Sequence, residues 1–72
     1  MSTIMMYHRD GKGVLHFREA MYDEESAEFM ITQGPVGFMA NGSTVAGIDA
    51  EAAEKKFAAF AAKSAELGYA AI

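Results

Sequence analysis

The sequence has no cysteine, no tryptophan and only one proline. Without cysteine the chain cannot form a disulfide framework, and it cannot build a metal site from thiolate ligands. It has no apolar run that approaches the roughly 20 residues of a membrane span. Its first ten residues show neither the basic start nor the apolar stretch of a signal peptide. We therefore expect a soluble, cytoplasmic protein with no membrane partner.

Length and charge narrow the class further. The 72 residues are expected to form one small domain, residues 1–72. A hydrophobic content of 51% is high enough for a packed core, which argues against a disordered chain. The formal net charge of −4 argues against non-specific binding to nucleic acid or to anionic membranes, because such binding needs a basic surface.

Short β-type runs separated by turn signals precede residue 49. Asp10-Gly11-Lys12-Gly13 and the charged segment 23–26 are turn signals. Asn41-Gly42 is the pair preferred in two-residue type I′ hairpin turns, because both positions take a positive φ. Pro35 cannot donate to a β-ladder, so it belongs at an edge, a bulge or a strand end. The expected strands are 3–8, 14–22, 28–33, 36–40 and 43–48, and 69–72 is a candidate final extended piece.

Alternation within these runs predicts which side chains share a face. In the run 14–22, Leu15, Phe17 and Met21 lie on one side, which predicts a strand with one apolar face and one mixed face. We interpret Met21, Met30 and Met39 as core residues rather than as an interface, because methionine is usually buried.

One helix is expected after the strands. Asp49 is suited to the N-cap, and Gly68 stands where a left-handed C-terminal stop is expected. Helical spacing places Ala53, Phe57, Phe60, Ala61, Ser64 and Leu67 on one face. Strands followed by a helix predict an α+β fold, a small antiparallel β-sheet of four to five strands with one C-terminal amphipathic α-helix packed on one face.

No catalytic constellation stands out. His8 and His16 would need a third donor to hold a metal, and we interpret them as solvent-facing strand residues. The serines and threonines lie in no nucleophile-elbow motif. The glycine-rich segment 32–42 is followed by a strand-like run and lacks the lysine of a phosphate-binding loop, so we interpret its glycines as turn residues. We therefore predict no enzyme activity, no cofactor and no metal.

Two charged clusters are candidate partner surfaces. The acidic patch consists of Asp23, Glu24, Glu25 and Glu28. Such a cluster is usually a solvated turn, and it can also bind a basic surface of a partner protein. A basic group near the first strands is the alternative nucleic-acid patch, and it consists of Arg9, Lys12 and Arg18.

From Val14 onward the chain resembles the WGR domain, a small module of poly(ADP-ribose) polymerases and many bacterial proteins. The resemblance is carried by the motif position Gln33-Gly34-Pro35-Val36-Gly37, Gly42, Ile48-Asp49-Ala50-Glu51-Ala52-Ala53, Phe57, Phe60 and Lys63-Ser64-Ala65-Glu66-Leu67-Gly68-Tyr69. It implies a single WGR-like domain without catalysis of its own.

The motif departs from the family pattern at two positions. Gln33 replaces the motif tryptophan and Pro35 replaces its arginine, residues that the family links to contacts with nucleic acid and neighbouring domains. Only Gly34, Val36 and Gly37 match. We therefore expect a stand-alone, non-catalytic module that binds a protein through the motif loop, which runs from Gln33 through Phe38.

Three alternatives stay open. The first is DNA binding through Arg9, Lys12 and Arg18, and the second is a small acidic inhibitor of a nucleic-acid-binding protein. A homodimer through methionines on an edge strand is the third.

Overall fold

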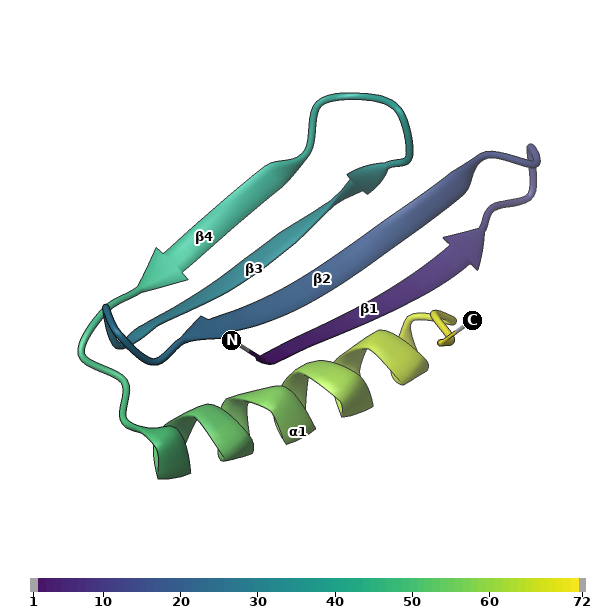
Figure 1. The fold of residues 1–72 in the computed structure, drawn as a ribbon. Coiled ribbons are helices and arrows are strands. Elements are labelled where there is room, and N and C mark those ends of the chain that lie inside the picture. The colour runs from purple at the N-terminus through teal and green to yellow at the C-terminus, as the bar shows by residue number, and fades with distance from the viewer. Residues whose placement is uncertain (1, 72) are drawn as a thin grey trace.

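In the part of the chain that the structure describes, four strands form one antiparallel meander, and a single helix crosses one of its faces (Figure 1). The computed structural model describes residues 2–71. The elements are β1 (Ser2–Arg9), β2 (Leu15–Asp23), β3 (Glu28–Pro35), β4 (Asn41–Val45) and α1 (Ala50–Glu66). The sheet order is β1-β2-β3-β4, so each strand pairs with its neighbour in sequence. The predicted α+β fold, with its C-terminal helix on one face, is confirmed.

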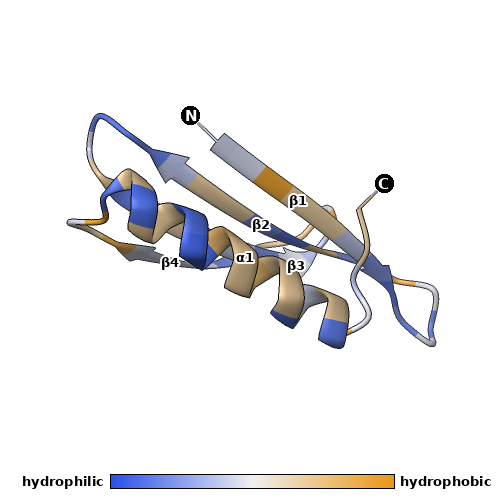
Figure 2. Ribbon diagram, turned by 90° about the horizontal axis from the view of Figure 1, so that it is seen from below, coloured by the Kyte–Doolittle hydropathy of each residue, from blue (hydrophilic) through white to orange (hydrophobic). Residues whose placement is uncertain are grey.

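The core lies between α1 and the sheet face that the helix covers (Figure 2). Ala20 of β2 is fully buried, and its small side chain lets the helix lie close to the sheet. Phe29 of β3 meets Phe57 of α1 edge to face, with ring centroids 5.1 Å apart. The buried core residues are Met6, Ala20, Tyr22, Phe29, Ala53 and Phe60.

Local signals set both ends of α1. The Asp49 carboxylate accepts a hydrogen bond of 2.8 Å from the backbone N–H of Ala52, as predicted for an N-cap. At the other end Gly68 adopts φ +93°, and the Tyr69 N–H donates to the Ser64 C=O at 2.9 Å. These bonds, with Gly68 N–H to the Ala65 C=O, form a Schellman motif.

The residues after the helix return to the sheet. The backbones of Tyr7 and Ala70 exchange two hydrogen bonds of 2.8 Å, so the C-terminal segment pairs with β1 near the strand's end. This confirms an extended piece at Ala70, while Ile72 lies outside the described residues. Leu67, expected on the buried helix face, is 47% exposed because it is the C-cap, where the helix ends.

The predicted hairpin turn at Asn41-Gly42 is wrong. Both residues belong to β4, and Gly42 lies opposite Thr32 in the β-ladder. The predicted strand 36–40 is instead the connection between β3 and β4. It begins with a turn in which the Phe38 N–H donates to the Pro35 C=O, and Gly37 takes φ +89° at the position where such a turn needs glycine. Pro35 ends β3, as expected for a strand-end proline.

Three predictions about burial differ from the structure. Leu15, Phe17 and Met21 share one face of β2, as predicted, and this face points away from the helix, because its residues alternate with the buried Ala20 and Tyr22. Met21 and its cross-strand partner Met30, expected in the core, therefore lie outside it. Met39, expected in the core, is 94% exposed in the β3–β4 connection. His8 and His16 oppose each other on the helix side of the sheet and are partly buried rather than solvent-facing.

None of the helical structure within residues 2–71 is long and apolar enough to cross a membrane bilayer.

Candidate functional site

The sheet face opposite α1 is rich in apolar side chains, and no element of residues 2–71 covers it (Figure 1). We call it the open face. Tyr7 lies opposite Phe17, and Met21 lies opposite Met30, so apolar pairs cross the strands. A hollow of about 290 Å³ on this face is lined by Met5, Tyr7, Phe17, Glu19 and Val36. The apolar members of the open face are Met5, Tyr7, Leu15, Phe17, Met21 and Met30.

The motif loop continues this face. Val36 lines the hollow of the open face, and its N–H donates to the Leu15 C=O at 2.8 Å. Phe38 is 73% exposed at the tip of the β3–β4 connection. Gln33 instead lies on the helix side, where its side-chain oxygen accepts from Arg18 at 2.9 Å. The structure therefore joins Val36 to the open face and separates Gln33 from it.

Two glycines give the motif loop its shape. A Cβ on Gly34 would lie 3.1 Å from Ala40 Cα and 3.2 Å from the Met39 carbonyl oxygen, so a side chain there would crowd the backbone of the returning chain. Gly37 has open space around it, but its φ of +89° favours glycine. Both matching motif glycines therefore have a structural reason in this fold.

The acidic patch is brought together by the turn between β2 and β3. Asp23 and Glu28 are cross-strand neighbours, and Glu24 and Glu25 are exposed between them. The Asp23 carboxylate accepts from the Glu25 N–H at 3.1 Å. By strand alternation Asp23 and Glu28 stand on the open face, directly beyond the pair of Met21 and Met30. The acidic patch therefore borders one end of the open face.

The three residues of the alternative nucleic-acid patch do not share a surface. Arg9 and Lys12 belong to the hairpin between β1 and β2, where the Arg9 guanidinium donates to the Gly13 C=O at 2.6 Å. Arg18 lies on the helix side instead. Its Nε donates to the buried Ser64 Oγ at 2.9 Å, and its guanidinium lies 5.2 Å from the centroid of the Phe60 ring.

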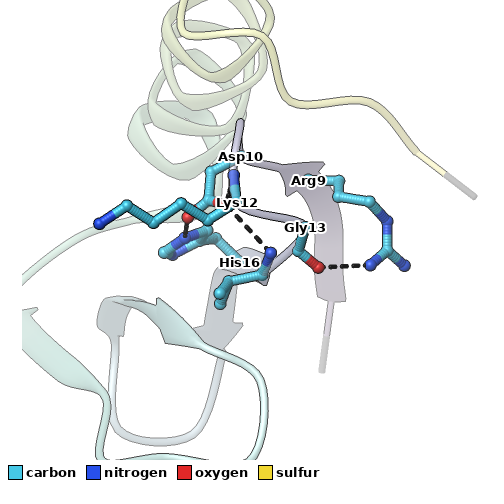
Figure 3. Close-up of polar contacts among 6 residues, drawn as sticks. Arg9, Asp10, Lys12, Gly13 and His16 are labelled. Atoms are coloured by element: carbon cyan, nitrogen blue, oxygen red, sulfur yellow. Dashed lines mark hydrogen bonds and ion pairs between the residues drawn. The ribbon is translucent and has the colours of Figure 1, made fainter.

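A network of hydrogen bonds fastens the β1–β2 hairpin (Figure 3). One Asp10 carboxylate oxygen accepts from the N–H groups of Lys12 and Val14 at 2.8 and 3.0 Å. The other lies 2.8 Å from His16 Nε2. The His16 hydrogen bond, followed by the two backbone bonds, lowers the pKa of Asp10 from 3.8 to about 2. This cluster closes a turn, and within residues 2–71 no three His, Asp or Glu side chains are arranged to hold a metal.

Sequence reasoning missed the open face as a surface, although its signal was visible. The alternation of Leu15, Phe17 and Met21 marked an apolar strand face, and its residue Met21 was assigned to the core. A comparison of the chain with protein-family models, with characterised proteins and with solved structures gives no match, so the WGR resemblance stays a prediction.

Proposed function

We propose that this chain is a non-catalytic binding module that binds a partner protein through the open face and the adjoining Val36–Phe38 end of the motif loop. The observation that carries the proposal is the uncovered apolar sheet face. Soluble proteins rarely leave a contiguous apolar patch of this kind without a partner or ligand. The proposal keeps the cytoplasmic location and the WGR-like character expected from the sequence.

The charges on the open face indicate what kind of partner fits. Glu19 lies near its centre and Asp23 and Glu28 at one end, whereas Arg9 stands at the opposite end. A complementary partner would present apolar side chains, with Lys or Arg opposite Glu19 and toward the acidic end. This charge distribution disfavours nucleic acid on the open face, because phosphates would meet carboxylates there.

The proposal is tested by affinity purification of the tagged protein from its native cells. A Phe17→Ser/Met30→Ser variant removes two apolar contacts of the open face. Leu67→Ser is the matched control, since Leu67 is 47% exposed at the end of the helix and away from this face. We expect the variant to lose its specific partner at least tenfold while the control retains it, provided that circular dichroism shows both to be folded.

Two charge-reversal variants make this experiment more specific. Glu19→Lys reverses one charge on the open face, and Glu66→Lys makes the same change at the exposed end of α1. Only the Glu19 change should weaken binding to a partner that places Lys or Arg opposite Glu19. Equal recovery of the same proteins by wild type and by both open-face variants would refute the proposal. A doubled mass by light scattering would identify the partner as a second copy.

A further inference from the structure

A second surface lies on the helix side of the sheet, in the groove between α1 and β4. The helix lies nearest β1 and β2, so the helix-side residues of β3 and β4 are left partly uncovered. The groove encloses about 280 Å³. Its floor includes Ile31, Ser43 and Val45, and its helix wall includes Lys56, Ala59 and Lys63.

The groove gathers positive charge in an acidic protein. Arg18, Lys56 and Lys63 all line it, which is three of the six Lys and Arg residues, and no Asp or Glu does. The one ion pair within residues 2–71 is that of His16 and Asp10, so none of the three cations is paired there. Lys56 and Lys63 are seven residues apart, which places them on one side of α1 with about 10 Å between them along the axis.

Arg18 is held in position at the base of this groove. Its guanidinium bonds to Ser64 and Gln33 and lies over the Phe60 ring, with the Tyr69 ring centroid 5.9 Å away. A guanidinium has five N–H donors, and these two bonds leave others for an anion. Because the side chain is already ordered, a carboxylate that binds it causes little additional loss of side-chain entropy.

The outer edge of β4 adjoins the groove and is unprotected. All five residues of β4 are exposed, and no other segment of residues 2–71 lies beside this edge (Figure 1). Natural edge strands usually carry charge, proline or a bulge that blocks pairing. The β4 sequence, Asn-Gly-Ser-Thr-Val, contains neither charge nor proline. The opposite edge, β1, is partly closed by the bridge between Tyr7 and Ala70.

We propose that the groove and the β4 edge together bind an extended acidic peptide segment, which adds to the sheet as a fifth strand. Its backbone pairs with β4, and its side chains alternate between the two sheet faces. Acidic side chains at alternate positions point toward α1, where they meet Lys56 and Lys63, with Arg18 deeper in the groove. Three such positions over five residues span about 13 Å, which is enough to reach both lysines.

Selection from a random heptapeptide phage library tests this inference with the whole protein. We expect enrichment of proline-free peptides with Asp or Glu at alternate positions. Binding of a fluorescein-labelled selected peptide should then weaken at least tenfold in a Lys56→Glu/Lys63→Glu variant, and it should weaken with added salt. Two single variants provide the matched control. Lys56→Glu changes a residue that lines the groove, whereas Lys55→Glu makes the same change at an exposed residue that does not line it.

Each outcome decides the inference. Failure to enrich acidic peptides, or equal binding by wild type and the double variant, would overturn it. A selected peptide that tolerates proline at every central position would also overturn it, because strand addition needs backbone N–H groups. This groove is on the opposite side of the sheet from the open face, so loss of binding here leaves the proposed function untouched, and the converse also holds.

Discussion

Individual charged residues are part of the structure of this small protein. Arg18 stands between the sheet and the helix, and it satisfies the hydroxyl of Ser64, which is fully buried. Its guanidinium lies over the Phe60 and Tyr69 rings. A charged residue therefore occupies a core-facing position at which strand alternation would predict an apolar one. The helix-side face of β2 therefore looks mixed in sequence although it faces the core.

Asp10 makes the folded state sensitive to acid. Its pKa is lowered from 3.8 to about 2, so its contribution to stability is fully present above about pH 4 and is lost as the pH falls through 2. Asparagine at this position does not titrate. We therefore expect the melting temperature of Asp10→Asn to fall less than that of wild type between pH 4 and pH 2.

Circular dichroism melts at several pH values in this range provide the measurement. Glu66→Gln, which removes an exposed carboxylate at the end of the helix, is the control and should follow the wild-type curve. A wild-type slope that persists in Asp10→Asn would show that other carboxylates cause the acid sensitivity.

Among the elements, α1 was the one that local sequence could define. Asp49 and Gly68 act within one turn of the helix ends, so their effect does not depend on the rest of the fold. The β3–β4 connection was predicted incorrectly because two sites in it could form the turn. Asn41-Gly42 has the stronger local preference, but Gly37 and the close approach at Gly34 place the turn earlier. Only the register with β3 decides between them.

A substitution at Gly68 tests the C-terminal stop of α1. It has φ +93°, and a Cβ added there would lie 3.3 Å from His8 Nδ1. Gly68→Ala therefore combines an unfavourable left-handed conformation with crowding against β1, and we expect it to lower the free energy of unfolding by about 1–2 kcal/mol. Urea denaturation measures this change. Gly11→Ala is the control, because Gly11 has no positive φ and nothing within 4 Å of an added Cβ. A similar loss in both variants would contradict the role of the helix stop.

The whole molecule shows which part of the fold a sequence leaves undetermined. Alternation in β2 shows that its two faces differ, but it does not show which face receives the helix. The more apolar face carries Leu15, Phe17 and Met21, and of these Met21 was expected in the core. The helix packs on the other face because Ala20 allows close approach and Arg18 is satisfied by Ser64. The face of β2 that carries Met21, a residue expected in the core, is therefore the candidate binding surface.

This assignment of faces predicts a difference between two phenylalanines. Phe29 is 3% exposed and packs on Phe57, so Phe29→Ala should cost about 3–5 kcal/mol, which exceeds or equals the stability expected of a domain this small. Phe17 is only partly buried on the open face, and Phe17→Ala should cost about 1 kcal/mol. Circular dichroism should therefore show an unfolded Phe29 variant and a folded Phe17 variant.

If both variants unfold alike, the open face is itself a covered core, and a partner or second copy must be present in the purified protein. That result would be checked by repeating the Phe17→Ala melt at several protein concentrations, because dissociation of a second copy makes the melting temperature depend on concentration.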